Sequence, residues 1–501
     1  MVKFPSQMHT MNYKENWQEE YKRKLVSAEE AAKVIKSGDR VIVSVGYSGI
    51  VGAAIVARSG ELKNVEIVSA GQLIDPGWFS PGYESFHTTC EIYLGNLARP
   101  SHDEKRTDFL PNTVGTVFKL YDDQRPERKP IDVLLTEVSP PDENGFCSFG
   151  SELWHRKKYA KFAKTVIGEV IPGLFRTYGE NYIHVSELDY IVEVPQEPLT
   201  DEEVQVLFDF TPPETHDRLR ARVPILQQVG RFIRPLLRII PTVPTSFLLT
   251  FLGIDSPDEV ARGIAENLKT ILKNGDTIQI GVGRPSYFMV ELGVFDGFED
   301  LGIHSEMAAP GMALLVKRGI ATGKYKTLHP GKAVFGAFTG FSPEDYLFAA
   351  NNPCFELYSQ DYVANIRTVA AHDNMVAINN GLQVDLTGQI TCETQFGPRI
   401  INGPGGQIEF HIGAFLSKGG RAVTLLRSTA LGGAVSTIVP QLDKGSLVTI
   451  QRHFADYVVT EYGVARLAGK SHRERADELI AVAHPDHRAE LRKESQKLFY
   501  P

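Results

Sequence analysis

A single glutamate at the end of an apolar stretch is the clearest candidate for chemistry in this chain. In the segment 302–307, Gly-Ile-His-Ser-Glu-Met, the residues His304, Ser305 and Glu306 interrupt apolar sequence where a strand is expected to end. A carboxylate at such a position could face a cleft, whereas the plainer interpretation is a glutamate on the surface. The motif alone leaves both interpretations open.

The same segment also suggests a metal site, because His304-Ser-Glu306 followed by Pro353-Cys354 resembles the zinc-binding pattern of nucleobase deaminases. That pattern requires a second cysteine at position 357, which is Leu357. The cysteines of the chain lie far apart and form no Cys-x-x-Cys pair; they are Cys90, Cys147, Cys354 and Cys392. Without three plausible ligands we predict no metal ion.

A glycine loop after one expected strand could hold an anion. The segment Gly281-Val282-Gly283-Arg284-Pro285 stands between a β-branched run and a helical pattern, where backbone amides can cradle a phosphate or an oxyanion. A dinucleotide fingerprint needs a third glycine at position 286, which is serine, so a nicotinamide-dependent dehydrogenase is disfavoured. The segment 463–471 has five residues between its glycines where a P-loop has four, so ATP hydrolysis is not supported.

The segment 402–410, Asn-Gly-Pro-Gly-Gly-Gln-Ile-Glu-Phe, concentrates glycine in a polar context. Glycine loses more conformational entropy than other residues when it is ordered, so such a run needs a reason. Close approach of the backbone to a ligand is one explanation, and a tight turn between strands is the other. The sequence does not choose between them.

Strands and helices must position these candidates, and one pattern of them occurs twice. Residues 31–49 and 266–285 each contain a helical stretch, a Lys-x-Gly-Asp turn, a β-branched strand and a glycine loop. Apolar strand candidates alternate with helical stretches; they include 132–138, 333–338 and 375–380. This alternation favours mostly parallel sheets covered by helices. We therefore predict an α/β fold built from two copies of one unit.

One stretch interrupts this pattern. Between residues 218 and 254 there is no acidic residue, and arginines accompany apolar runs; the arginines are Arg218, Arg220, Arg222, Arg231, Arg234 and Arg238. The stretch could lie on a membrane surface, close as a lid over an apolar pocket, or pack between domains or subunits. Prolines 235, 241 and 244 cut any helix short, which favours packing.

Composition narrows the class of protein. The chain has 501 residues, of which 42% are hydrophobic, enough for two to four domains with real cores. A formal net charge of -8 argues against binding to nucleic acid through bulk positive charge. The polar N-terminus lacks the apolar core of a signal peptide, and no apolar run is long enough for a membrane span. Dispersed cysteines favour a reducing setting, so we predict a cytoplasmic enzyme.

Several long motifs, in order, resemble the acetyl-CoA hydrolase/transferase group of the class I coenzyme A transferases. That group includes 4-hydroxybutyrate, butyryl and succinyl:acetate CoA-transferases. The motifs lie at 37–41, 138–150, 176–193, 301–307, 383–390, 403–410, 436–443 and 456–486. The resemblance covers most of the chain except roughly 204–251. It implies a domain at 1–203, an insertion at 204–253 and a second, similar open α/β domain at 254–501, with the active site at the domain interface.

In this family the glutamate of the Gly-Ile-His-x-Glu-Met motif is the nucleophile, so the resemblance assigns that role to Glu306. Attack on an acyl-CoA gives a mixed anhydride, and the CoA thiolate then forms a glutamyl-CoA thioester. The resemblance implies oxyanion donors and CoA contacts at Asn379, at the loop 281–285 and at Gly405 and Gly406, with Lys418 as a candidate partner for a phosphate. Coenzyme A enters as substrate, and no further cofactor is expected.

The chain departs from its relatives at residues 284–288, Arg-Pro-Ser-Tyr-Phe, and at Glu409, where relatives usually have aspartate. With the apolar insertion, these changes could shape a pocket for a bulky or aromatic acid, although Arg284 could equally pair with a dicarboxylate. We predict a cytoplasmic homodimer that exchanges CoA between acyl-CoA and carboxylic acids. The alternatives are an acyl-CoA hydrolase with the same glutamate, and a non-catalytic acyl-CoA-binding or membrane-docked protein.

Overall fold

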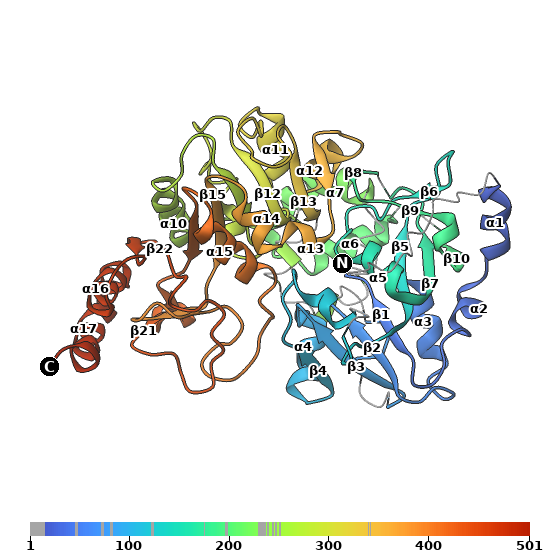
Figure 1. Cartoon of the computed structure of the whole chain (residues 1–501), viewed down its shortest axis with the longest axis horizontal. Coiled ribbons are helices and arrows are strands. Elements are labelled where there is room, and N and C mark those ends of the chain that lie inside the picture. The colour runs from blue at the N-terminus through green and yellow to red at the C-terminus, as the bar shows by residue number, and fades with distance from the viewer. Residues whose placement is uncertain are drawn as a thin grey trace, which may run out of the picture.

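The computed structural model describes residues 16–45, 49–71, 75–80, 84–121, 125–174, 176–195, 199–228, 237, 240–242, 245, 248–249, 252–338, 340 and 342–501. Two α/β halves lie side by side along the long axis of the molecule (Figure 1). The last two helices, α16 (His472–Val482) and α17 (Pro485–Phe499), lie beyond the second half, at the end of the molecule farthest from the first.

The first half is built on a seven-stranded sheet in which every pairing is parallel. In spatial order the strands are β10 (Tyr190–Glu193), β7 (Ala163–Val170), β5 (Ile131–Val138), β1 (Arg40–Val43), β2 (Val65–Ser69), β3 (Phe86–Glu91) and β4 (Thr107–Leu110). The helices are α1 (Trp17–Lys24), α2 (Ala28–Ala32), α3 (Ile50–Ala57), α4 (Gly95–Asp103) and α5 (Arg156–Phe162). All four residues of β1 are buried, as expected for a parallel sheet with both faces covered.

The second half carries a nine-stranded sheet. In spatial order the strands are β23 (Gly463–Arg466), β22 (Tyr457–Thr460), β18 (Arg421–Leu425), β15 (Met375–Asn380), β11 (Thr277–Ile280), β12 (Gly302–Met307), β13 (Ala333–Ala337), β14 (Phe355–Leu357) and β8 (Tyr178–Gly179). Only β22 and β23 pair antiparallel. Because β8 comes from residues 178–179, the chain enters the second sheet before the predicted boundary at residue 203.

The helices of the second half are α10 (Glu259–Lys269), α11 (Met312–Lys317), α12 (Pro343–Ala349), α13 (Gln360–Val363), α14 (Ile366–Ala370) and α15 (Gln407–Leu416). Smaller sheets decorate the molecule: β16 (Gln383–Asp385) with β17 (Ile390–Thr391) and β21 (Ile438–Val439), β19 (Thr429–Ala430) with β20 (Val435–Ser436), and β6 (Phe146–Cys147) with β9 (Ile183–His184).

The internal repeat is visible in the order of the strands. Strand β1 lies between β5 and β2, and β3 lies beyond β2. In the same way β11 lies between β15 and β12, and β13 lies beyond β12. The register agrees as well, because Arg40 pairs with Glu66 in the first half and Thr277 pairs with Gly302 in the second. The predicted fold of two similar open α/β units is therefore confirmed.

The insertion folds as a helical unit on the second half. It contains α6 (Asp201–Asp209) and α7 (His216–Gln228), and its buried leucines form a small core of their own, which includes Leu207, Leu219 and Leu252. Arg222 of α7 forms an ion pair of 3.1 Å with Glu344 of α12. This arrangement agrees with the packing interpretation. Arg231, Arg234 and Arg238 lie outside the described residues.

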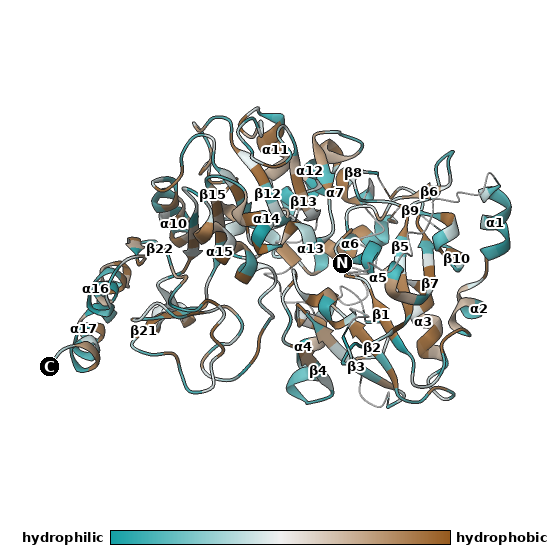
Figure 2. Ribbon diagram, viewed as in Figure 1, coloured by the Kyte–Doolittle hydropathy of each residue, from teal (hydrophilic) through white to brown (hydrophobic). Residues whose placement is uncertain are grey.

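One apolar core extends across the junction of the halves. It joins Ile92 and Trp154 of the first half to Met307, Phe338 and Phe410 of the second. Figure 2 shows where hydrophobic and hydrophilic residues lie: strands inside each half are largely brown, and α1 at the outside is mostly teal. None of the described helices is both long enough and apolar enough to cross a bilayer.

Candidate active site

Glu306 lies at the carboxyl end of β12, the edge at which parallel α/β sheets usually bind ligands. All six residues of β12 are buried, and Glu306 is only 6% exposed. The interpretation of Glu306 as a surface residue is therefore wrong. Its carboxyl group lies instead among groups from both halves of the molecule.

Three groups hold Glu306 in place. The hydroxyl of Tyr93 donates to Oε1, and the backbone N–H of Gly406 donates to Oε2 at 2.8 Å. The side-chain amide of Gln360 donates to the main-chain oxygen of Glu306 at 2.9 Å. Tyr93 follows β3 in the first half, whereas Gly406 and Gln360 belong to the second. The carboxylate is thus positioned at the junction of the two halves.

The surroundings of Glu306 make its carboxyl group a weak acid. Burial raises the pKa of Glu306 to about 7. The hydrogen bond from Tyr93 lowers this pKa, the charge of nearby Glu409 raises it, and the N–H of Gly406 lowers it. Burial also raises the pKa of Glu409 to about 7. Its Oε1 accepts hydrogen bonds from the Thr113 hydroxyl and, at 3.0 Å, from the N–H of Gly115.

The glycine-rich segment places the N-terminus of a helix next to Glu306. Residues 403–406 lead directly into α15, so the interpretation as a turn between strands is wrong. The backbone approaches closely, but the group that it approaches is Glu306: a Cβ at Gly406 would lie 2.4 Å from Oε2. The donated N–H lies at the positive end of the helix dipole, which favours negative charge on Glu306.

The loop that starts at Gly281 lies beside Glu306. Strand β11 runs between β12 and β15, and its register, continued past the last pairs, places Gly281 between Glu306 and Asn379. Adjacent strands lie about 4.8 Å apart, so all three residues belong to the same small region. The structure thus brings together Glu306, Asn379, the start of the loop and Gly406.

Side-chain amides brace this region. Asn379 is 5% exposed, and its amide exchanges two hydrogen bonds with Gln279, at 2.9 and 3.0 Å. Asn380 donates to the oxygen of Val282 at 2.8 Å and accepts from the N–H of Ser286 at 3.2 Å, which fixes the loop. Sequence reasoning found Asn379 and missed its partner Gln279 and the brace Asn380.

The outer part of the loop is open to solvent. Val282 is exposed, the peptide between Arg284 and Pro285 is cis, and the Arg284 side chain is 39% exposed. The guanidinium of Arg284 forms an ion pair with Asp255. Burial, and then the charge of Arg427, lower the pKa of Arg284. A second arginine, Arg427, therefore lies near Arg284 at the outer part of the loop, and it was not predicted.

Lys418 stands apart from the other predicted residues. It lies two residues beyond the end of α15, whereas Gly406 directly precedes the start, so the ten-residue helix, about 15 Å long, and Ser417 separate them. Its side chain is 87% exposed and forms an ion pair of 3.6 Å with Asp373. The structure does not bring Lys418 to Glu306.

Tyr93 and Glu409 complete the site, and no local sequence pattern indicates the contact that either makes. Tyr93 lies 213 residues before Glu306, in the other half of the chain. At the sequence level Glu409 is visible only as a departure from the aspartate usual in relatives. The glycines at 405 and 406 signalled a close approach, but a local pattern cannot name the residue approached.

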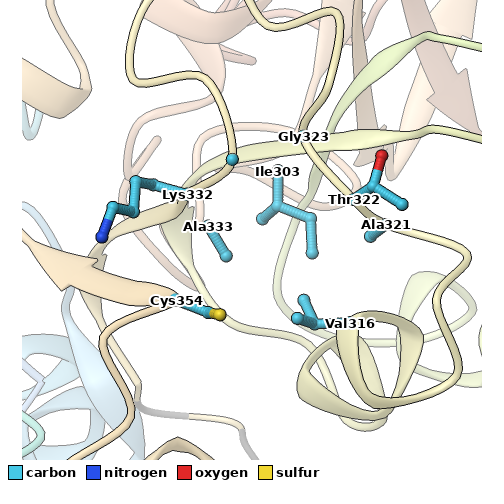
Figure 3. Close-up of a pocket in the computed structure, with 9 residues that line it drawn as sticks. Ile303, Val316, Ala321, Thr322, Gly323, Lys332, Ala333 and Cys354 are labelled. Carbon is cyan, nitrogen blue, oxygen red and sulfur yellow. The ribbon is translucent and has the colours of Figure 1, made fainter.

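A cavity of about 200 Å³ lies at the opposite edge of the second sheet (Figure 3). Among its lining residues are Ile303 and Ala333, close to the amino ends of β12 and β13, together with Val316, Ala321, Lys332 and Cys354. His304 points to the other face of β12 and donates to or accepts from the oxygen of Val363 at 2.8 Å. No predicted site residue lines this cavity, and His304 and Cys354 do not converge. The described residues contain no group of three or more potential metal ligands.

Comparison with known proteins identifies the family. Residues 8–200 match the model of the acetyl-CoA hydrolase/transferase N-terminal domain, and residues 342–495 match that of the C-terminal domain. The chain is 37% identical to 4-hydroxybutyrate coenzyme A transferase of Clostridium kluyveri, over 96% of this chain and 100% of that protein. The chain belongs to the acetyl-CoA hydrolase/transferase family.

Other members of the acetyl-CoA hydrolase/transferase family support the assignment. The chain is 32% identical to succinyl-CoA:cyclohexane-1-carboxylate CoA transferase of Geobacter metallireducens, over 97% of this chain and 98% of the relative. The crystal structure of RipA from Yersinia pestis superimposes with a TM-score of 0.78 at 26% identity, covering 97% of this chain and 100% of that structure. In the sequence, Glu306 falls in the stretch between the two matched segments, 8–200 and 342–495.

Proposed function

We propose that the chain is a CoA-transferase that moves coenzyme A from an acyl-CoA to a carboxylic acid through an intermediate on Glu306. One observation carries the proposal: a buried carboxylate lies between the hydroxyl of Tyr93 and the N–H of Gly406, close to the glycine loop at 281–283. Relatives of the same length bear the names of CoA transferases.

The proposed reaction needs only carboxylates and thiolates. Glu306 attacks the thioester carbonyl, the carbon–sulfur bond breaks, and CoA thiolate leaves a mixed anhydride behind. The thiolate then attacks Cδ of Glu306 and releases the first acid as a carboxylate, which leaves glutamyl-CoA. A second carboxylate reverses both steps. Burial of Glu306 excludes water, which would otherwise hydrolyse the intermediates.

The proposed roles of the other residues follow from their positions. The N–H of Gly406 stabilises negative charge on Oε2, and the loop at Gly281, Val282 and Gly283 with Asn379 stabilises the oxyanion on the substrate side. Gly405, Arg284 and Pro285 contact coenzyme A. Lys418 remains a proposal for a more distant phosphate contact. Coenzyme A is the substrate, and the proposed chemistry uses no other cofactor.

We propose that the acceptor is a bulky acid. Tyr93 and Tyr287 place aromatic rings near Glu306: Tyr93 donates to Oε1, and burial and Glu306 both raise the pKa of Tyr287. Buried Trp154 supports the ring of Tyr93 edge to face at 6.0 Å. The name of the relative from Geobacter metallireducens refers to a cyclic carboxylate. Succinyl-CoA and acetyl-CoA are the donors to test first.

We also propose that the enzyme is a cytoplasmic homodimer. All four cysteines are unpaired, which supports a reducing compartment. Light scattering should give twice the chain mass of 55.6 kDa. A mass equal to one chain would contradict the dimer.

The function is tested by the dependence of acyl-CoA consumption on an added carboxylate. We expect consumption of acetyl-CoA or succinyl-CoA only with an acceptor acid, with one new acyl-CoA formed for each one consumed, and none with Glu306→Gln. Release of free CoA without any acceptor would identify a hydrolase instead. If no carboxylic acid of a wide set supports turnover, the alternative of a non-catalytic acyl-CoA-binding protein would be favoured.

A further inference from the structure

The segment that carries Tyr93 adopts a strained backbone. Ile92 has a φ of 67°, in the left-handed region, which is rare for a β-branched residue. Such a conformation costs on the order of 1–3 kcal/mol and persists only where surrounding structure enforces it. Ile92 itself is fully buried in the core that joins the two halves. We therefore ask whether the strained backbone at Ile92 serves to position the next residue, Tyr93.

The strained turn directs the phenol of Tyr93 to the Glu306 carboxyl group. The ring of Tyr93 packs edge to face on Trp154, with ring planes at 80°. The chain opposite leaves room for the hydroxyl only because residue 405 is glycine, since a Cβ there would lie 2.6 Å from the Tyr93 oxygen. Backbone conformation, ring packing and this gap together fix the donor on Oε1 of Glu306.

The two oxygens of Glu306 therefore have different partners. Oε2 accepts the N–H of Gly406 at 2.8 Å, a backbone donor that cannot turn away. Oε1 accepts a hydroxyl, which uses one lone pair and leaves another for attack. The fixed amide suits the oxygen that stays a carbonyl and becomes an oxyanion, and the hydroxyl suits the oxygen that forms and breaks bonds.

We propose that Tyr93 is a catalytic residue whose hydroxyl stays with the Glu306 oxygen that attacks the thioester and then departs in the released acid. The inference rests on the proposed function and adds a role for a residue from the first half. Tyr93 thereby couples the reaction to the correct docking of the two halves.

The bonds balance as follows. Oε1 bonds to the acyl carbon while the carbon–sulfur bond breaks, and Oε1 becomes the bridging oxygen of the anhydride. When the thiolate attacks Cδ, the bond from Cδ to Oε1 breaks and Oε1 leaves as a carboxylate oxygen of the first acid. The hydroxyl of Tyr93 donates to Oε1 as its charge develops. Tyr93 keeps its proton, because burial and then the charge of Glu306 raise its pKa well above the usual value.

The test compares Tyr93→Phe with wild type in the formation of glutamyl-CoA at Glu306, trapped with borohydride at short times. Two donors are used, acetyl-CoA and fluoroacetyl-CoA, whose acids differ in basicity. We expect Tyr93→Phe to slow trapping with acetyl-CoA by about 10²-fold, the usual loss for one oxyanion donor. With fluoroacetyl-CoA the loss should be clearly smaller, because the weaker base leaves with less help. The KM for acetyl-CoA should stay near that of wild type.

Tyr21→Phe is the matched control. Its hydroxyl donates at 2.8 Å to the carboxylate of Glu193 in the same half, away from Glu306. Trapping at wild-type rate in Tyr93→Phe, or equal slowing with both donors, would overturn the proposal. If Tyr93→Phe does not fold, 3-fluorotyrosine at position 93 replaces it. Its hydroxyl is a stronger hydrogen-bond donor, so the difference in trapping rate between acetyl-CoA and fluoroacetyl-CoA should become smaller. An unchanged rate difference between the two acyl-CoA substrates would overturn the proposed role of Tyr93.

The same experiment separates this inference from the proposed function. If wild type forms no adduct on Glu306, the function itself is contradicted, and the role of Tyr93 falls with it. If wild type forms the adduct and Tyr93→Phe forms it equally fast, the function stands and only the role of Tyr93 fails.

Discussion

Glu306 has to be ionised to attack a thioester, yet its burial favours the protonated form. The structure offsets part of this cost with donors from Tyr93 and Gly406, and it leaves a pKa of about 7. A basic carboxylate is a better nucleophile than an ordinary one, but it is also the group most sensitive to pH near neutrality.

The pH dependence of adduct formation follows from this pKa. Below about pH 7 the rate of attack on acyl-CoA should fall about tenfold per pH unit, because the protonated glutamate does not attack. Above this pH the rate should reach a plateau. Stopped-time borohydride trapping at pH 5 to 9 measures it. A rate independent of pH down to 5 would mean that Glu306 is not the titrating nucleophile.

Glu409 should control the pH below which the rate of adduct formation falls, called the acid limb of the pH–rate profile. Its charge raises the pKa of Glu306, so Glu409→Gln should move the limb to lower pH. Glu409→Asp, the residue usual in relatives, should keep the limb near its wild-type position. Glu393→Gln is the control, because Glu393 is another buried carboxyl with a threonine partner, the Thr449 hydroxyl at 2.7 Å. An unmoved limb in Glu409→Gln would show that the two carboxyls do not interact.

Secondary-structure elements bring the site together from the ends of four strands, β3, β11, β12 and β15, and from the start of α15. The strand pattern at 375–380 predicted β15 with the bounds that the structure has, and the repeated helix–turn–strand pattern predicted two equivalent units. These features are local, so sequence periodicity reports them. The meaning of the segment at 403–406 was not local, because it depends on which group lies opposite the start of α15.

Space at the start of α15 should be essential for the reaction. Gly406 has an ordinary φ of -94°, so alanine fits the backbone, but its Cβ would lie 2.4 Å from Oε2 of Glu306. We expect Gly406→Ala to reduce adduct formation by about 10²-fold or more through a displaced donor. Gly60→Ala, where nothing lies within 4 Å of the added Cβ, is the control. Full activity in Gly406→Ala would contradict the role of this amide.

At the scale of the whole molecule, the site exists only because the two halves dock. Tyr93 reaches Glu306, and Thr113 and Gly115 reach Glu409, all across the junction. The family motifs predicted Glu306 as the candidate nucleophile and an active site at the domain interface, and Glu306 does lie at the junction of the halves. They did not predict these partners, because contacts between residues more than 200 positions apart leave no periodic pattern in a single sequence.

Burial of Glu306 should also be measurable as a cost to stability. A carboxyl whose pKa is raised on folding stabilises the protein below about pH 4.5, and this contribution is lost as pH rises through about 7. Relative to wild type, Glu306→Gln should therefore gain about 3 kcal/mol of unfolding free energy between pH 4.5 and pH 8. Denaturant unfolding at both pH values measures the gain. A difference that does not change with pH would mean that Glu306 is not buried as described.

The most direct test of the account is mass spectrometry of the protein after incubation with acyl-CoA and borohydride, beside Glu306→Gln. Borohydride reduces a glutamyl thioester to an alcohol, so the peptide that contains Glu306 should lose one oxygen and gain two hydrogens. The account predicts this change in wild type alone, even without an acceptor acid to discharge the intermediate. An unmodified Glu306 during rapid acyl-CoA turnover, or the change on another residue, would contradict it.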